Sequence, residues 1–398
     1  MLEISKGLYS IGALDKDLRV FDIVMETEFG TTYNSYLLKT NDGVALFETV
    51  KEKFFDEYLK RIQSFTDLCD IKYIIVNHTE PDHAGSVEKL LNLAPNATVI
   101  GSNIALKYLK EIINKDFKSI SVKDNATLQL GDKTLRFISV PNLHWPDTMY
   151  TYIEETKTLV SCDSFGAHYA DDCVLKSNLP QDKEDDYISA YKYYFNMIMG
   201  PFKPFVLKAL DKIKDIDIEY ICPGHGLVLD KNNITKYMNL YKEWSTVVPR
   251  EVPSVVIPYV SAYGYTEKLA YKIKEGIESC DMNIDVFIYD LVTTDLNTVM
   301  NEINTCRGLI LGSPTILADA LPPIWSILTS LNPVIHKGLL VSCFGSYGWS
   351  GEAVKNITER FHQLKFKVIV EPLAIPFKPS EEELLKAFYF GVDFANSL

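Results

Sequence analysis

The sequence lacks any apolar stretch long enough for a membrane-spanning helix. No apolar run approaches the roughly 20 residues that cross a bilayer, and the opening MLEISKGLYS has neither the basic start nor the apolar segment of a secretory signal. Positive charge is also scarce, because 40 Lys and Arg stand against 53 Asp and Glu, a net charge of -13. Phosphate groups repel such a surface, so we expect no nucleic-acid and no membrane partner. We therefore expect a cytoplasmic protein.

Cysteine and histidine are both few. The seven cysteines are odd in number and form no CxxC pair, which argues against a disulfide framework and a zinc ribbon. We interpret them as small buried residues in a reducing compartment. There are also only seven histidines, but five of them lie between positions 78 and 225: His78, His83, His144, His168 and His225. If imidazoles bind a metal, we expect them to do so in the first half.

A domain boundary is expected within the segment TVVPREVP, residues 246–253. A helical stretch precedes it and a β-rich run follows it, and two prolines with two charges suit a short linker. With 398 residues the chain is long enough for two hydrophobic cores. We place the first domain at residues 1–248 and the second at residues 253–398.

After this boundary, apolar runs alternate regularly with amphipathic segments. This alternation indicates a parallel sheet covered by helices on both faces. Five such units have the size and rhythm of a flavodoxin-like domain, a five-stranded parallel doubly wound sheet. The runs expected as buried strands are Val255–Pro258, Ile284–Tyr289, Gly308–Leu311, Leu339–Cys343 and Phe366–Val370.

The first half mixes hairpins with helix-covered strands. Residues 31–50 predict a hairpin whose turn is Asn41-Asp42-Gly43, and residues 129–140 and 148–162 predict further hairpin strands. Helix and strand patterns alternate over residues 54–102. This mixture predicts an α/β sandwich of two sheets with outer helices.

The densest polar motif, HTEPDH, follows the predicted strand IKYIIV directly. It places two imidazoles and two carboxylates within six residues, and burying them without partners would be costly. Three more polar residues each follow another predicted strand, where a sheet would hold them rigidly. The complete set of candidate ligands is His78, Glu80, Asp82, His83, His144, Asp163 and His225.

Seven groups exceed the four ligands of one tetrahedral zinc. They indicate two metals, with one carboxylate able to bridge them. Imidazoles and carboxylates without thiolate suit iron, zinc or manganese, and the anionic oxygen of Glu80 favours iron. A single strand-end histidine such as His225 is by itself more often structural than a ligand, so the prediction depends on the whole set.

Three loops at predicted strand ends have the composition of a flavin site. The first opens a helix, and its hydroxyls and glycine suit a phosphate monoester at the helix N-terminus. It lacks the lysine of a Walker A loop. All three lie where α/β sheets bind ligands, and Tyr347 or Trp349 could stack on an isoalloxazine ring. Each alone is also an ordinary turn, but together they predict FMN. The loops are Ser261-Ala262-Tyr263-Gly264-Tyr265-Thr266, Gly312-Ser313-Pro314-Thr315 and Gly345-Ser346-Tyr347-Gly348-Trp349-Ser350-Gly351.

The HxExDH motif resembles the HxHxDH signature of the metallo-β-lactamase superfamily, with Glu80 replacing the second histidine. Joined to a flavodoxin-like domain, it is similar to the flavodiiron family over nearly the whole chain. The resemblance implies a metallo-β-lactamase-like αββα sandwich with two non-haem iron ions, followed by a flavodoxin-like domain with FMN. It also implies an oxidoreductase that reduces dioxygen to water, nitric oxide to nitrous oxide, or both.

The resemblance further assigns the ligands. One iron would be bound by His78, Glu80 and His144. The other would be bound by Asp82, His83 and His225, and Asp163 would bridge the two. In one variant of the family the residue at the position of His83 turns away from the metal.

Two further interpretations concern groups around the metals. His168 resembles a histidine of the family that lies behind the metal ligands or in the substrate pocket, although a surface-loop position is equally compatible with the sequence. The aromatic run Tyr191, Tyr193, Tyr194 and Phe195 could place a tyrosine near the substrate, or could simply be core at helical spacing.

The resemblance also implies partners. A head-to-tail homodimer, or a dimer of dimers, would bring FMN of one subunit to the irons of the other. Because no rubredoxin or reductase segment follows the second domain before Leu398, we expect an external electron donor, either rubredoxin or a reduced deazaflavin. The rival hypotheses are a dinuclear zinc hydrolase fused to a flavodoxin module, and an electron carrier with inert metal.

Overall fold

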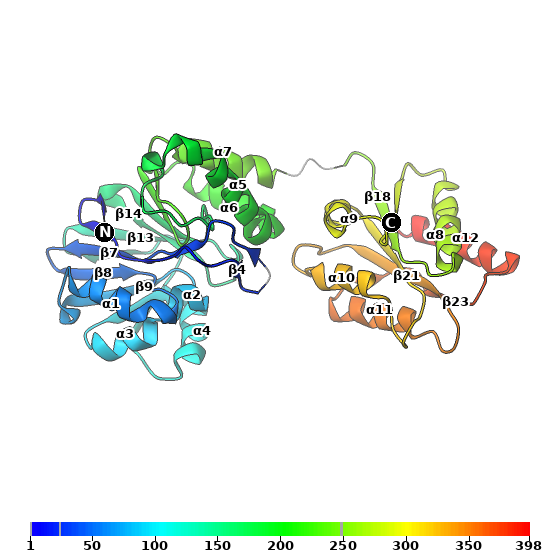
Figure 1. Cartoon of the computed structure of the whole chain (residues 1–398), viewed down its shortest axis with the longest axis horizontal. Coiled ribbons are helices and arrows are strands. Elements are labelled where there is room, and N and C mark those ends of the chain that lie inside the picture. Colours follow the sequence, from blue (N-terminus) through cyan, green and yellow to red (C-terminus); the bar gives the residue numbers. More distant parts are fainter. Residues whose placement is uncertain (1, 24, 247–249) are drawn as a thin grey trace. The chain divides into compact units, whose positions relative to one another are not determined.

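The computed structural model describes residues 2–23, 25–246 and 250–398. The chain divides into two compact units, one ending at residue 247 and the other beginning at residue 248 (Figure 1). Residues 247–249 of the predicted linker lie outside the described residues. No helix in the described ranges is long and apolar enough to cross a membrane.

Two stacked sheets form the centre of the first unit. The first has seven strands in the order β1-β2-β7-β8-β9-β10-β11, and the second has six strands in the order β12-β13-β14-β15-β16-β17. Their bounds are β1 (Glu3–Ser5), β2 (Leu8–Ser10), β7 (Tyr36–Thr40), β8 (Gly43–Phe47), β9 (Ile71–Val76), β10 (Thr98–Ser102), β11 (Ser119–Val122), β12 (Thr127–Leu130), β13 (Lys133–Ser139), β14 (Met149–Ile153), β15 (Thr158–Cys162), β16 (Tyr220–Pro223) and β17 (Leu229–Asp230). The predicted hairpin is present as β7 and β8, with Thr40 opposite Gly43.

Helices cover both outer faces of this pair of sheets (Figure 1). One core cluster joins the inner faces, with Phe47 and Ile75 from the first sheet and Phe137 and Val160 from the second. A second cluster joins the first sheet to α1, α3 and α4, and a third joins the second sheet to α5, α6 and α7. The result is the predicted αββα sandwich. The helices are α1 (Phe55–Gln63), α2 (Pro81–Ala84), α3 (Val87–Leu93), α4 (Asn103–Ile113), α5 (Glu184–Tyr194), α6 (Lys203–Ile213) and α7 (Ile234–Ser245).

Two short two-stranded ribbons complete the first unit. Strand β3 (Ala13–Asp15) pairs with β6 (Thr31–Tyr33), and β4 (Val20–Phe21) pairs with β5 (Met25–Glu26). They follow the β1–β2 pair in the chain and carry Phe21, Thr31 and Thr32 to the region where the candidate ligands gather.

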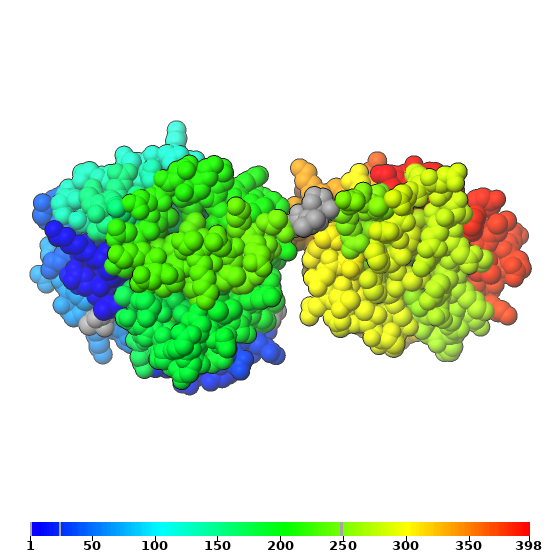
Figure 2. Space-filling view, turned by 90° about the horizontal axis from the view of Figure 1, so that it is seen from above, coloured from blue at the N-terminus to red at the C-terminus, as the bar shows by residue number. Residues whose placement is uncertain are grey.

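The second unit is a parallel sheet with helices on both faces. Its order is β19-β18-β20-β21-β22, the 2-1-3-4-5 order of flavodoxin-like folds. One core cluster packs α9, α10 and α11 on one face, and another packs α8 and α12 on the other; Figure 2 shows α12 in red at the surface. The elements are β18 (Ser254–Tyr259), α8 (Tyr265–Glu278), β19 (Asp285–Asp290), α9 (Leu296–Ile303), β20 (Gly308–Gly312), α10 (Pro322–Ser330), β21 (Leu340–Tyr347), α11 (Glu352–Gln363), β22 (Lys367–Val368), β23 (Leu373–Pro376) and α12 (Glu381–Asn396).

The last strand differs from the expected continuous run Phe366–Val370. Strand β22 pairs only with the beginning of β21, and β23 pairs with its end. Pro372 stands between the two pieces, and a proline has no N–H with which to continue a hydrogen-bonded ladder. The edge of the sheet is therefore formed by two short strands.

The interpretation of the cysteines as uniformly buried is only partly right. Cys162, Cys222 and Cys343 are buried, but Cys69 is exposed. Its position, in a short helical turn just before β9, faces solvent. All seven thiols are free.

Candidate functional site

The candidate metal ligands stand at the ends of strands in both sheets of the first unit. His78 lies two residues beyond β9, and Pro81 then begins the short helix α2, which presents Asp82 and His83. Proline suits this first helical position because its missing N–H is not needed there. Asp163 follows β15 directly, and His225 follows β16.

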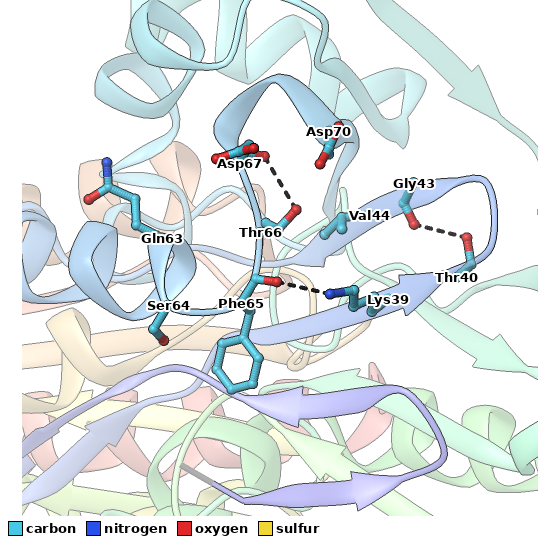
Figure 3. A pocket seen from close by; sticks show the side chains of 10 residues that line it. All are labelled: Lys39, Thr40, Gly43, Val44, Gln63, Ser64, Phe65, Thr66, Asp67 and Asp70. Carbon is cyan, nitrogen blue, oxygen red and sulfur yellow. Dashed lines mark hydrogen bonds between the residues drawn. The ribbon is translucent and has the colours of Figure 1, made fainter.

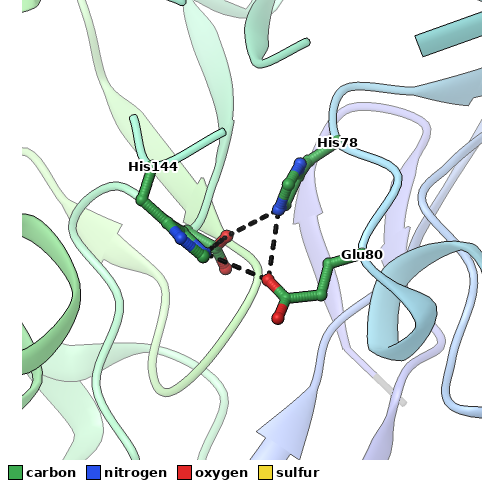
Figure 4. A group of neighbouring side chains, drawn as sticks. His78, Glu80 and His144 are labelled. Carbon is green, nitrogen blue, oxygen red and sulfur yellow. Dashed lines mark hydrogen bonds and ion pairs between the residues drawn. The ribbon is translucent and has the colours of Figure 1, made fainter. Parts of the chain in front are cut away.

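The first group gathers around one carboxylate oxygen of Glu80. Its Oε2 lies 3.2 Å from Nε2 of His78 and 3.0 Å from Nε2 of His144 (Figure 4). The Oδ2 atom of Asp163 lies 3.6 Å and 3.4 Å from the same two nitrogens. Four potential ligand atoms thus lie within 4.8 Å of one another, which is the spacing of atoms that surround a common ion.

The second group gathers on the other side of Asp163. Its Oδ1 lies 2.9 Å from Nε2 of His83 and 3.6 Å from Nε2 of His225. Asp82 completes the group, with Oδ2 3.1 Å from Nε2 of His225 and Oδ1 3.6 Å from Nε2 of His83. Each group therefore faces a different oxygen of Asp163, the arrangement of a carboxylate shared between two ions.

Hydrogen bonds behind the ligands fix how two imidazoles face the centre. Nδ1 of His78 lies 3.2 Å from Asp147, whose other oxygen accepts from the backbone N–H and hydroxyl of Thr79. Nδ1 of His225 donates to the carbonyl of Thr32 at 2.6 Å. In both rings Nδ1 is held as a hydrogen-bond donor, so Nε2 is the nitrogen that faces the centre and would bind a metal once it has lost its proton.

His168 is buried beside the second group rather than lying in a surface loop. Its Nδ1 lies 2.9 Å from the hydroxyl of Thr31, and its ring centre lies 5.1 Å from that of His225 and 4.9 Å from that of Tyr194. In the aromatic run, Tyr194 donates a 3.2 Å hydrogen bond to Oδ1 of Asp163, whereas Tyr193 is partly exposed. One tyrosine of that run thus touches the candidate centre.

The ionisation of these groups reflects their mutual attraction. Burial opposes a charge on His78, but hydrogen bonds to Asp147 and Glu80 outweigh it and raise its pKa to about 10. Burial is likewise overcome at His144, where Asp163 and Glu80 raise the pKa to about 9. Burial also works against the charge of Asp163, yet the adjacent imidazoles hold its pKa well below its usual range. Without metal, His78 and His144 are therefore protonated beside an ionised Asp163.

The donor set fits two cations. Both oxygens of Asp82 and the Oδ2 atom of Asp163 are buried without a hydrogen-bond donor among the described residues. Buried carboxylate oxygens without donors are costly, and a cation in each group would satisfy them. Mixed imidazole and carboxylate ligands without thiolate suit iron, zinc or manganese.

The three loops predicted for FMN meet at the carboxyl ends of β18, β20 and β21. Thr266 Oγ1 lies 2.9 Å from Ser346 Oγ, which joins the first loop to the third. The backbone N–H of Thr315 donates to the carbonyl of Ser346 at 3.0 Å, which joins the second to the third. Gly264 has φ +77° at the turn into α8, a conformation that glycine adopts without a Cβ penalty.

In these loops the residues next to the sheet are buried and closely packed, whereas two aromatic rings are exposed to solvent. Gly345 is buried so closely that a Cβ there would overlap the carbonyl of Ser313. Tyr263 is 83% exposed and Trp349 fully exposed. Ser313 turns inward, because its hydroxyl binds the carbonyl of Pro314 and the N–H of Leu321. The exposed rings and the N-terminus of α8 fit a planar ligand that carries a phosphate.

Comparisons with known proteins agree with both halves of this description. Residues 31–226 match the model of the ODP family of β-lactamases, and residues 257–391 match the flavodoxin model. The flavo-diiron protein FprA2 of Clostridium acetobutylicum is 40% identical over 400 residues, covering 100% of this chain and 99% of that protein. The type A flavoprotein fprA of Rhodobacter capsulatus is 37% identical over 402 residues, and the match covers 99% of this chain and 91% of that protein.

The chain belongs to the flavodiiron proteins.

Two solved structures share its fold. The rubredoxin oxygen:oxidoreductase of Desulfovibrio gigas superposes with a TM-score of 0.67 at 28% identity, covering 99% of this chain and 98% of that one. The flavodiiron protein of Giardia intestinalis superposes with a TM-score of 0.65 at 28% identity, covering 99% and 96%. This flavodiiron protein is therefore an oxidoreductase, and its cofactors are a pair of non-haem irons and FMN.

Sequence reasoning missed several carboxylates beside the candidate ligands, among them Asp147 and Asp22. Asp147 lies three residues beyond His144 and holds His78. Asp22 follows β4, where burial and then a hydrogen bond to Glu80 raise its pKa to about 6. Neither stands in a recognisable motif. The only signal for Asp147 was its place in the same loop as His144.

One hollow of the first unit lies away from the candidate ligands. It measures about 600 Å³ and lies between the β7–β8 hairpin and the segment after α1 (Figure 3). Its lining includes Lys39, whose Nζ donates to the carbonyl of Phe65 at 3.1 Å, and Asp67 and Asp70. No candidate ligand lines it, so it has no part in the metal site.

Proposed function

We propose that this flavodiiron protein reduces dioxygen to water, nitric oxide to nitrous oxide, or both, with electrons that FMN relays from an external donor. The observation that supports this most is the division of the candidate ligands into two groups around Asp163. His78, Glu80 and His144 would bind one iron, Asp82, His83 and His225 the other, and Asp163 both. When bound, the two irons and FMN together supply the four electrons that turn one dioxygen into two waters.

The residues around the irons would hold and supply protons. Burial and the neighbouring His225 hold the pKa of His168 well below its ordinary value, so its ring is neutral at pH 7. If Nδ1 accepts from the hydroxyl of Thr31, then Nε2 carries the proton. That Nε2 atom is buried and has no partner in the described part of the chain, so it is available to donate a hydrogen bond to a reduced substrate.

Tyr194 would keep Asp163 in its shared position. Its hydroxyl donates to Oδ1, the oxygen that faces the second group. Because Tyr194 is fully buried, its pKa is raised well above its ordinary value, and the phenol stays protonated as a donor. A fixed bridge would in turn fix the distance between the irons, and so the width of the place where a diatomic substrate binds.

Electron delivery would involve partners. The FMN loops and the candidate iron ligands belong to different units of the chain, and we propose that FMN of one subunit faces the irons of another in a head-to-tail dimer or dimer of dimers. The fully exposed Trp349 supports a covering partner for the FMN loops. Rubredoxin is the proposed donor, supported by the name of the similar Desulfovibrio gigas structure, with a reduced deazaflavin as the alternative.

Steady-state consumption of each gas tests this function. With two irons and one FMN bound, and with reduced rubredoxin or deazaflavin as donor, we expect consumption of dioxygen or nitric oxide much faster than by free FMN. Dilution to monomer should abolish flavin-to-iron electron transfer. Purified protein with two zincs that hydrolyses thioesters or lactams would instead establish the hydrolase hypothesis.

A further inference from the structure

Glu48 lies behind His83, on the side of the imidazole away from Asp163. It is completely buried and directly follows β8. Its carboxylate, a ring nitrogen of His83 and the sulfur of Cys162 lie within 4.8 Å of one another. Because Nε2 of His83 faces Asp163 at 2.9 Å, the nitrogen that remains for Glu48 is Nδ1.

All but one of the polar atoms of Glu48 have partners. Its N–H donates to the carbonyl of Ile75, its carbonyl accepts from Ser35, and Oε1 accepts from the N–H of Asn77 at 2.9 Å. Among the described residues, Oε2 of Glu48 is buried without a hydrogen-bond partner, and so is Nδ1 of His83. Because the Glu48 carboxylate and the His83 ring are neighbours, we expect these two atoms to pair directly or through one water, since leaving both buried and unpaired is costly.

The backbone around Glu48 also holds His83. Both the N–H and the hydroxyl of Thr49 donate to the carbonyl of His83, at 2.7 and 2.6 Å. Glu48 itself has φ +57°, a left-handed conformation that is unfavourable for a side chain of this kind and is found where surrounding structure enforces it. The segment Glu48–Thr49 therefore contacts His83 twice. Thr49 binds its backbone carbonyl, and the Glu48 carboxylate lies beside its ring.

We propose that Glu48 is the positioning residue that keeps His83 a metal ligand. This rests on the ligand assignment in the proposed function. A carboxylate at Nδ1 holds the proton there and leaves the lone pair of Nε2 directed at the iron, as Asp147 does for His78 in the other group. Without that acceptor the ring is free to take the opposite tautomer, with a proton on Nε2, and to turn away.

Glu48→Gln tests this with little change of shape. Its remaining oxygen must still accept from the N–H of Asn77, so the amide NH₂ faces Nδ1 of His83. Two donors cannot pair, and His83 would move its proton to Nε2, where it blocks metal binding. We expect the affinity for the second iron to fall about 10- to 100-fold, the usual effect of losing a partner behind a ligand. The metal-free variant should retain the circular dichroism of the unaltered chain.

A double-mutant cycle with His83→Ala separates positioning from a structural role. If Glu48 acts through His83, adding Glu48→Gln to His83→Ala should change iron affinity by no more than about twofold, the scatter of independent sites. An equal loss in both backgrounds would overturn the proposal. Cys162→Ala is the matched control, and a loss as large as that of Glu48→Gln would assign the role to the thiol. Because the readout is iron affinity, a chain that binds two irons but reduces neither gas would refute the proposed function and leave this result standing.

Discussion

The two cofactor sites of this protein are built in opposite ways. The metal site consists of side chains, nearly all buried, that contact one another directly; His78 and Asp163 are at most 2% exposed. The FMN loops depend on backbone and on aromatic rings that face solvent, with Trp349 fully exposed. A site made of mutually dependent side chains should fail when one is removed, whereas a site spread over three loops should weaken by degrees.

The largest expected effect comes from Asp163→Ala. Both groups use this carboxylate, and its loss would leave several imidazoles buried without their acceptor. We expect the affinity for both irons to fall by more than the roughly 100-fold that loss of a residue behind a ligand causes. Reduction of either gas should be lost with the irons. FMN content should be unchanged, as judged by flavin absorbance beside iron analysis. Parallel loss of FMN would break the distinction between the two sites.

Much of the metal site could be predicted because its chemistry is concentrated in sequence. The motif from His78 to His83 shows its polar residues beside an apolar strand, and strand ends on one sheet edge bring in the others. Asp147 and Glu48 could not be predicted in the same way. Each lies beside an imidazole that is far away in the chain. In the sequence, an Asp or a Glu at these positions looks like any polar residue of a loop or turn.

The fold was predicted most accurately where each element is locally marked. Alternating apolar and amphipathic runs identify the parallel sheet of the second unit, and the Asn41-Asp42-Gly43 turn marks the β7–β8 hairpin. The division of the edge strand into β22 and β23 was not predicted, although Pro372 is a visible breaker of a strand. Whether Pro372 ends the edge strand or divides it depends on how far β21 extends beside it, and only the assembled sheet shows that length.

A second comparison concerns pH. In the metal-free protein the pKa values of His78 and His144 are raised to about 10 and about 9, whereas burial lowers that of His336 in the second unit. Raised values mean that these two imidazoles stabilise the first unit fully below pH 6.5 and lose that contribution as pH rises through about 9 to 10. The lowered value means that stability from His336 is present above pH 6.5 and is lost as pH falls.

Calorimetry of the metal-free protein can separate these two dependences. The transition of the first unit should move to lower temperature between pH 6.5 and 10, and that of the second unit below pH 6.5. Iron should reverse the first trend, because binding displaces the protons and strengthens as pH rises. In Asp147→Asn the alkaline loss should be smaller, because a main partner of the His78 charge is weakened. An unchanged first transition over the alkaline range would contradict this account.

Tyr194→Phe should have an intermediate effect on the metal site. It removes the hydroxyl that donates to Asp163 Oδ1 and leaves the buried ring in place. A hydrogen bond to a charged group contributes about 1.5–3 kcal/mol, so we expect roughly a tenfold or greater loss of affinity for the iron on the His83 side. Iron titration measures this, and Tyr191→Phe is the matched control, since Tyr191 is equally buried and its hydroxyl donates to the carbonyl of Tyr237 rather than to Asp163. Equal effects of the two changes would show that general packing, and not the contact with Asp163, is responsible.

The smallest effect is expected for Trp349→Ala in the FMN loops. The ring is fully exposed in the free loop, so its removal should leave the unfolding of the flavin-free protein unchanged. Stacking on the isoalloxazine ring would contribute about 0.5–1.5 kcal/mol beyond the area it covers, which corresponds to a few-fold weaker FMN binding in a fluorescence titration. Iron content should not change. If this single ring instead abolished FMN binding, the flavin site would depend on one side chain as strongly as the iron site depends on Asp163, and the contrast between a distributed site and a concentrated one would be lost.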